Sequence, residues 1–229
     1  MRILRIVPLL SALAAAPLAA QGVDGTIWFT SSRGNGEVDT LVQYTRGSLI
    51  RLETHGAHGG EGMGAAIIDS KAQTLTIMMP SRKMYMVTPI KPPSAAMQKK
   101  VGDISFVKTG QTETVAGVSC DVYHVSRTAD DGKKREGDAC FAKGVGLRIG
   151  QIFSSFTGAA SLGLNNAAYQ QLTSQDMHIV KATGLSDKGE KDELVAIKID
   201  RSSPPSSMFT APSDYTKMEM PGNMPMSPP

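Results

Sequence analysis

Short segments that alternate between apolar and polar residues make up most of this chain, and they restrict its fold more than any other feature. Alternation with a period of two is typical of half-buried β-strands, and Gly, Pro, Asn, Asp and Ser between the segments favour tight turns. The pattern predicts about ten strands in successive hairpins. The expected strands are Gly25–Thr30, Asp39–Thr45, Ser48–Thr54, Ala65–Asp69, Thr74–Met79, Lys83–Thr88, Ile104–Lys108, Val118–Val125, Arg135–Ala142, Met177–Thr183 and Glu193–Arg201.

One or two helices are expected beside these strands. Phe153–Leu172 is the best helical segment, although Gly158 and Gly163 weaken it by up to about 1 kcal/mol each. Ser94 is a suitable N-cap for a short helix over Ser94–Lys100. We therefore expect a mainly β (α+β) fold, namely a curved antiparallel sheet or incomplete barrel covered by one or two helices.

The second and third expected strands form a hairpin around Arg46-Gly47, because glycine readily adopts the positive φ that tight hairpin turns require. This register places Leu41 opposite Leu52 on one face of the sheet. It also places Gln43 opposite Ile50 on that face, whereas the pairs Tyr44 with Leu49 and Val42 with Arg51 fall on the other face, because side chains alternate along a strand.

The N-terminus has the layout of a secretory signal peptide. Arg2 and Arg5 precede the non-polar run Ile6–Leu18, and small residues follow up to Ala20. This arrangement predicts cleavage between Ala20 and Gln21. The run is too short, and too often interrupted, to serve as a membrane-spanning anchor of roughly 20 apolar residues. We expect an exported, soluble protein, located in a bacterial periplasm.

The remainder of the chain reads as one domain followed by a tail. Residues 1–20 are the expected signal peptide, and residues 21–216 form a single β-rich domain without repeats. Residues 217–229 are rich in Met and Pro and are expected to be disordered. No later segment is long and apolar enough to predict a transmembrane helix.

Charge excludes one class of partner. The formal net charge of the whole chain is +3, and two of its basic residues, Arg2 and Arg5, belong to the expected signal. A nearly neutral mature chain argues against nucleic acid as a partner, because phosphate contacts require a strongly basic surface.

The two cysteines are expected to form a disulfide, because paired cysteines in exported proteins are usually oxidised. A hairpin symmetric about Asp130 would place Cys120 directly opposite Cys140, at a separation that a disulfide tolerates. Two buried free thiols are the alternative.

Several motifs resemble a family of exported bacterial domains known as domain of unknown function 4412. They are Tyr44–Arg51 (YTRGSLIR), Ile68–Tyr85 (IDSKAQTLTIMMPSRKMY), Thr109–Cys120 (TGQTETVAGVSC) and Phe209–Tyr215 (FTAPSDY). The order of hairpins is also similar to periplasmic lipoprotein carriers of the Lol type. This resemblance implies an incomplete barrel closed by helices over an apolar cavity, and hence a hydrophobic ligand. It does not transfer a particular ligand, because one fold supports many functions.

Catalytic signatures are absent from the sequence: it contains no G-x-S-x-G elbow, no H-E-x-x-H, no C-x-x-C and no Walker loop. We therefore expect a protein that is not an enzyme and that has no cofactor.

Two regions contain residues that could bind a metal. His55, His58, Glu61 and Met63 lie in a glycine-rich stretch that is better explained as a surface loop, because metal ligands need fixed orientations. The tail contributes soft thioethers that suit Cu(I). Its methionines are Met218, Met220, Met224 and Met226.

The sequence favours a non-enzymatic periplasmic protein that binds or carries a lipid or a lipoprotein acyl chain in an apolar groove. Copper handling by the Met-rich tail and a structural envelope module that binds an unidentified protein partner are the alternatives. The sequence leaves open which face of each strand lines the groove. The candidate ligand-binding residues are Trp28, Phe29, Leu75, Ile77, Tyr85, Val195 and Ile197.

Overall fold

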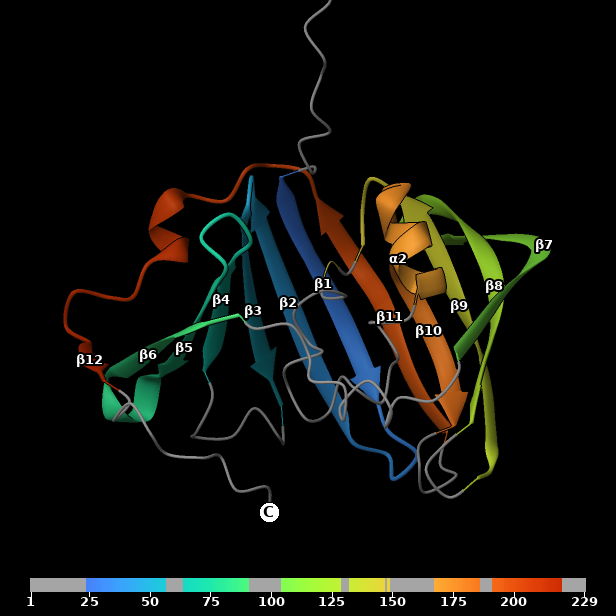
Figure 1. The fold of residues 1–229 in the computed structure, drawn as a ribbon, viewed down its shortest axis with the longest axis horizontal. Coiled ribbons are helices and arrows are strands. Elements are labelled where there is room, and N and C mark those ends of the chain that lie inside the picture. Colours follow the sequence, from blue (N-terminus) through green and yellow to red (C-terminus); the bar gives the residue numbers. More distant parts are fainter. Residues whose placement is uncertain are drawn as a thin grey trace, which may run out of the picture.

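The computed structural model describes residues 24–56, 64–90, 104–128, 132–146, 148, 167–185 and 191–219. These residues form one open sheet of twelve strands in the order β12-β6-β5-β4-β3-β2-β1-β11-β10-β9-β8-β7 (Figure 1). Neighbouring strands are antiparallel, except that β12 runs parallel to β6. The prediction of a mainly β, mostly antiparallel fold is confirmed.

Most strands begin and end close to the predicted positions, but β7 continues beyond its predicted end at Lys108 to Val115. Their bounds are β1 Gly25–Ser32, β2 Val38–Arg46, β3 Leu49–His55, β4 Ala65–Asp69, β5 Thr74–Met79, β6 Met84–Pro89, β7 Ile104–Val115, β8 Val118–Thr128, β9 Lys134–Lys143, β10 Met177–Leu185, β11 Lys191–Asp200 and β12 Thr216–Met218. The helical elements of the described ranges are the α-helix α2 (Ala167–Ser174) and the short 3-10 turns η1 (Pro80–Arg82) and η4 (Ser206–Phe209).

One sequence prediction about the elements needs correction. The strand that the sequence does not predict is β12, whose Lys217 and Met218 belong to the segment expected to be disordered. Of the expected helix over Phe153–Leu172, residues 153–166 lie outside the described residues, and the remainder falls in α2, which packs on β7 and β10. The signal peptide, the expected helix Ser94–Lys100 and tail residues 220–229 lie outside the described residues.

The register of the hairpin β2–β3 differs from the prediction by two residues. Leu52 lies opposite Gln43, and Leu41 lies opposite Thr54. The reason is the turn, which is Gly47-Ser48 rather than Arg46-Gly47, with Gly47 at φ +56°. A shift of two residues leaves each side chain on its predicted face, because side chains alternate with a period of two.

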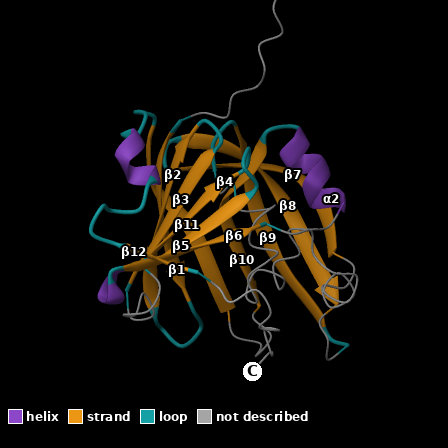
Figure 2. Cartoon of the chain, turned by 60° about the vertical axis from the view of Figure 1, so that its left-hand side comes forward, coloured by secondary structure: helices purple, strands orange, loops and turns teal. Residues whose placement is uncertain are grey.

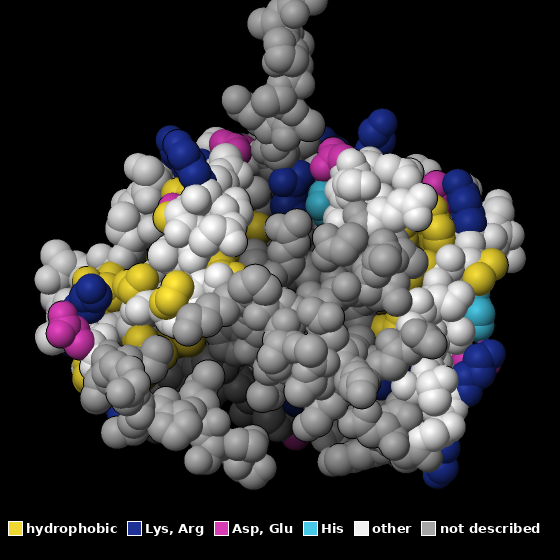
Figure 3. Space-filling model, in the orientation of Figure 1, with side chains coloured by type: hydrophobic (Ala, Val, Ile, Leu, Met, Phe, Trp, Pro, Cys, Tyr) yellow, Lys and Arg dark blue, Asp and Glu magenta, His cyan; other side chains and the backbone are white. Residues whose placement is uncertain are grey.

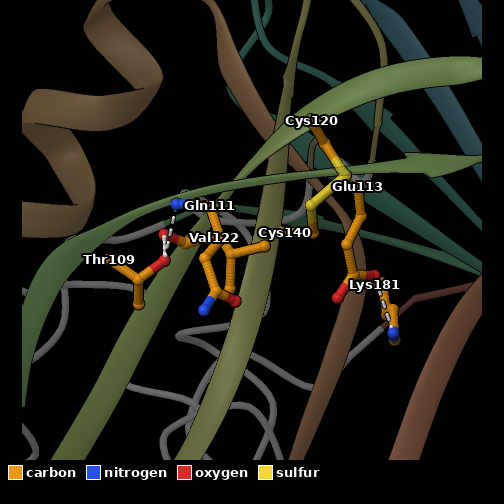
Figure 4. The surroundings of a disulfide bond; sticks show 7 residues. All are labelled: Thr109, Gln111, Glu113, Cys120, Val122, Cys140 and Lys181. Carbon is orange, nitrogen blue, oxygen red and sulfur yellow. Dashed lines mark hydrogen bonds and ion pairs between the residues drawn. A yellow bond between two sulfur atoms is a disulfide. The ribbon is translucent and has the colours of Figure 1, made fainter.

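The hairpin β7–β8 bends back over the sheet, as Figure 4 shows around the disulfide. Its register shifts between Lys108 and Thr112, and the Thr109 hydroxyl at this bend donates a hydrogen bond to the Val122 carbonyl (2.9 Å). Beyond the bend, Glu113 forms an ion pair with Lys181 of β10 (2.7 Å). The end of the hairpin therefore lies over β10 instead of extending the sheet outward.

The predicted disulfide between Cys120 and Cys140 is present, with the two Cα atoms 5.4 Å apart. The predicted register was wrong, because Cys140 lies opposite Val122 and the β8–β9 ladder ends at Asp121. Diagonal positions in a regular ladder are about 7–8 Å apart. The bend of β8 brings Cys120 within bonding distance of Cys140 (Figure 4).

The sheet is strongly curved and carries apolar clusters on both faces (Figure 2). We call the side of β1–β5 that carries Phe29 the Phe29 face and the opposite side of β2–β6 the Tyr44 face. On the Tyr44 face, the C-terminal segment returns across the strands and buries Phe209. At the other end of the sheet, Leu172 of α2 packs against Phe141 of β9.

Candidate functional site

The Phe29 face is a largely apolar surface across five neighbouring strands, interrupted on β2 by Gln43, which lies between Ile27 and Leu52. Leu52, Ala66 and Ile77 lie opposite one another on β3, β4 and β5. Phe29 of β1 is fully buried, whereas its neighbour Leu41 on β2 is only half-buried. This surface therefore combines a buried floor with accessible apolar side chains. The remaining apolar residues of the same face on β1 and β3–β5 are Ile27, Ile50, Ile68 and Leu75.

The structure places three of the candidate ligand-binding residues on this face. Phe29 and Leu75 are buried, and Ile77 is half-buried. The sequence left open which face of each strand these residues occupy, and in the structure each of the three has an apolar partner in register on the next strand. Whether they bind a ligand remains a prediction.

The other candidates lie elsewhere, so the seven do not form one surface. Trp28 is on the opposite side of β1, and Tyr85 packs in the cluster of the Tyr44 face. Val195 of β11 lies opposite Thr30, outside β1–β5, although it packs against the cluster that contains Phe29. Ile197 lies in a β-bulge that the β1–β11 register skips, and its side chain is 54 % exposed. Lys198 lies over the Trp28 ring, 4.4 Å from its centroid, so the indole already has a cationic partner.

The sheet separates along part of the boundary between β10 and β11. The ladder of these strands runs from Lys181/Val195 to Leu185/Lys191, and in the described structure no ladder pair continues beyond it. Both strands become irregular at this point, because the β9–β10 register skips Val180 and the β1–β11 register skips Ile197. We call this opening the seam.

The segment after β9 crosses at the seam and is held by Gln43, whose side chain is almost fully buried. We call residues 144–146 and 148 the strap. The Gln43 Nε2 atom donates a hydrogen bond to the Gly146 carbonyl (3.0 Å), and its Oε1 accepts one from the Arg148 amide (2.9 Å). A buried amide is tolerated in an apolar sheet only when such bonds satisfy it.

A second polar group fixes the strap from the side of β10. Oδ1 of Asp176 lies 3.0 Å from the His178 Nε2 atom and 3.3 Å from the Arg148 guanidinium. Burial lowers the pKa of His178 below its ordinary value, and the Arg148 charge lowers it further, while Asp176 opposes both. His178 Nδ1 is buried, and in the described structure it has no hydrogen-bond partner. His178 is therefore expected to be neutral at pH 7.

A cavity of about 20 Å³ lies beside the strap and holds about one water molecule by volume. Asp24, Gln43 and Arg148 line it together with apolar atoms of Ile27 and Ile199. The pKa of Asp24 is lowered chiefly by hydrogen bonds from the Gly47 amide and the Ser203 hydroxyl. This cavity cannot accommodate an acyl chain. This polar group was not predicted from the sequence, although Gln43 stands out as an amide on a predicted apolar face.

The metal predictions are tested only in part. Among the residues that the structure describes, no group of three or more His, Cys, Asp or Glu side chains is arranged to hold a metal. His55 pairs with Glu53 (3.5 Å), whereas His58, Glu61 and Met63 lie outside the described residues. Of the tail methionines, Met218 lies in β12, and Met220, Met224 and Met226 fall outside the description.

None of the described helices is long and apolar enough to span a bilayer.

Comparison with known families identifies the chain. The model of a domain of unknown function, DUF4412, matches residues 24–215. The chain belongs to the DUF4412 family. The match spans every described strand up to β11 and ends at Tyr215, directly before β12, and it confirms the resemblance found in the sequence.

Solved structures with a related fold include MucB, MucB in complex with MucA(peri), and the Pseudomonas aeruginosa MucA/MucB complex. Each is 12 % identical to the chain, with TM-scores of 0.42 for the two complexes and 0.40 for MucB alone. They cover 86–89 % of this chain, which spans only 57–62 % of theirs. A comparison with curated protein sequences finds no significant match.

Proposed function

We propose that this DUF4412 protein is an exported, non-catalytic binding domain whose Phe29 face receives an apolar chain, such as the acyl chain of a lipid or lipoprotein. One observation carries the proposal, namely the largely apolar surface over β1–β5. Leu41, Ala66 and Ile77 contribute half-buried side chains to it, so apolar area remains to be covered.

Elementary energetics support an apolar ligand on such a surface. Each CH₂ group that leaves water contributes about 0.8 kcal/mol, so a long acyl chain gains much from contact with several strands at once. The gain is non-directional. A face of branched aliphatic side chains would therefore select for length and apolarity of the ligand and much less for its headgroup.

The export signal expected over residues 1–20 is consistent with this function, because lipids and lipoproteins must cross an aqueous periplasm while shielded from water. The 20 Å³ cavity at the strap is not the binding site. Binding instead requires that the ligand lie along the strands of the Phe29 face.

The alternative functions use other surfaces. A structural envelope module would bind a protein partner, and the exposed bulge at Ile197 beside Trp28 is the surface that favours it. Copper handling by the tail would use Met220, Met224 and Met226, which lie outside the described residues.

Native mass spectrometry of the full chain, purified from envelope fractions, tests the proposal. We expect an added mass that a solvent extract identifies as a lipid or an acylated peptide. Ile77→Gln should reduce its occupancy, whereas the matched control Ile197→Gln, at an exposed bulge, should not. A ligand-free mass in repeated preparations, or equal occupancy in both variants, would contradict the proposal. A crosslinked envelope protein in place of a lipid would favour the interaction module.

A further inference from the structure

Four methionines from three strands meet on one face at the edge of the sheet. Met79 at the end of β5 lies opposite Met84 of β6, and Met86 lies beside Met218 of β12. Met79 shares the Phe29 face with Ile77, and Met84 and Met86 are two residues apart on one strand, so all four side chains point the same way. The sequence did not reveal this group, because β12 joins the sheet from the far end of the chain.

The spacing of these positions suits a shared ligand. Residues directly opposite on neighbouring strands have Cβ atoms roughly 4.5–5.5 Å apart, and residues two apart on one strand are separated by about 7 Å. Methionine has an unbranched, flexible side chain that adapts to irregular sites. The thioether sulfurs of Met84, Met86 and Met218 can therefore converge on one point above β6.

Core packing does not account for the group. Each of the four methionines is half-buried, and in the part of the chain that the structure describes none of them belongs to an apolar cluster. Met78 and Met208 differ, because both pack with Phe209 on the Tyr44 face. Figure 3 shows hydrophobic side chains reaching the surface on the side where β5, β6 and β12 lie in Figure 1.

We propose that Met79, Met84, Met86 and Met218 form a binding site for a soft monovalent metal ion, Cu(I) in the cell. Thioethers are neutral, polarisable ligands that select Cu(I) over hard cations and over divalent zinc. One nearby charge is already paired, since Lys83, directly before β6, forms an ion pair with Asp214 (3.0 Å). Because thioether ligands are neutral, they leave the charge of the bound metal ion uncompensated. A monovalent ion carries less of this charge than a divalent ion, so the site favours the monovalent one.

This site differs from copper binding by the tail, because it uses strand residues and only the first tail methionine. It also does not depend on the proposed acyl ligand. The C-terminal strand β12 has a role in this proposal, since it supplies Met218 and pairs with β6 through only three residues. Metal binding is therefore expected to hold β12 more firmly on the sheet.

Titration of the full chain with Ag(I), a redox-stable probe, and with Cu(I) under anaerobic conditions against a chromophoric competitor tests the site. With methionine methyl groups labelled with ¹³C, one equivalent of either ion should shift the signals of the four site methionines and leave Met208 unchanged. Zn(II) should shift none of them. No shift at these methyl groups in the unmodified protein would overturn the proposal.

Isosteric variants give the second readout. The triple change Met84→Leu, Met86→Leu and Met218→Leu keeps side-chain volume and should weaken Cu(I) affinity by at least about tenfold, since even indirect perturbation of metal ligands costs that much. Met208→Leu is the matched control and should bind as the unmodified chain does. Replacement of Met224 and Met226 by Leu should also leave affinity unchanged. Unchanged affinity in the triple variant, or loss in the tail variant instead, would contradict the site.

Discussion

The side-chain Oε1 atom of Gln43 accepts a hydrogen bond from the backbone N–H of Arg148 at 2.9 Å, although the two residues are 105 positions apart in the chain. This bond joins the hairpin β2–β3 to the strap that crosses the seam between β10 and β11. The amide nitrogen of the same side chain binds the Gly146 carbonyl, so one residue satisfies two backbone groups of the strap.

Gln43→Leu is expected to lower the free energy of unfolding by about 2 kcal/mol or more, because the strap would retain two buried backbone groups without partners. Urea denaturation of the variant measures this loss. Gln111→Leu, an exposed glutamine on β7, is the matched control and should change stability little. Equal stability of the two variants would show that Gln43 does not anchor the strap.

The stability of the protein should depend on pH through His178. Burial and Arg148 lower the pKa of His178 in the folded state, so the unfolded chain binds a proton first as the pH falls. The free energy of unfolding should therefore decrease from about pH 6.5 down to the folded pKa and stay level below it for this group. Each pH unit between the two pKa values corresponds to about 1.4 kcal/mol.

Denaturation curves between pH 7.5 and pH 4.5 measure this dependence. His178→Gln should remove its contribution in that window, whereas His124→Gln, at a histidine with a 45 % exposed side chain, should retain it. NMR titration of the unmodified protein gives the pKa of His178 directly. A pKa at or above 6.5 would refute the assignment of His178 as a buried neutral side chain.

Gly146→Ala should destabilise the protein more than Gly36→Ala. A Cβ atom at Gly146 would lie 2.7 Å from the His178 Cβ and 2.8 Å from its carbonyl, in addition to the cost of φ +136°. Gly36 has φ +85° but nothing within 4 Å of its Cβ position, so only the backbone cost of about 1 kcal/mol applies. Thermal unfolding of both variants compares these costs. A smaller loss of stability for Gly146→Ala than for Gly36→Ala would mean that the strap moves to accommodate the added Cβ atom at little cost.

Replacement of Cys120 and Cys140 by Ser should lower stability by about 3 kcal/mol, the loop-closure entropy of a crosslink with a sequence separation of 20. Guanidinium denaturation measures the loss. Ligand mass and occupancy should not change, because the disulfide lies at the β8–β9 end of the sheet. A changed ligand in the variant would mean that the folded-back hairpin contributes to binding.

Sequence periodicity predicts most of this fold because the sheet is built mainly from hairpins between neighbouring segments. The hairpin Ala65–Asp69 with Thr74–Met79 was predicted at its observed bounds. The register of β2–β3 was predicted two residues out of place, because alternation fixes the face of Leu41 but not its partner. Turn geometry decides that remaining choice.

Contacts between segments far apart in the chain were not predicted from the sequence, and the reason is physical. The strand β12 has only three residues, and its parallel pairing with β6 has no local signal. The bulges at Val180 and Ile197 change how their strands run, so alternation alone does not place the nearby candidates Val195 and Ile197 on the Phe29 face. The anchoring of the strap by Gln43 likewise depends on residues that the chain brings together only after folding.

Photocrosslinking with a diazirine-labelled fatty acid, followed by peptide mapping, tests the proposed function most directly. We expect the label to attach to side chains of the Phe29 face, especially Leu41, Ala66 and Ile77, and Ile77→Gln should reduce the amount of attached label. An excess of unlabelled fatty acid should reduce the labelling by competition. Absence of labelling, or labelling confined to Met208 and Tyr215 on the Tyr44 face, would contradict acyl-chain binding on the Phe29 face.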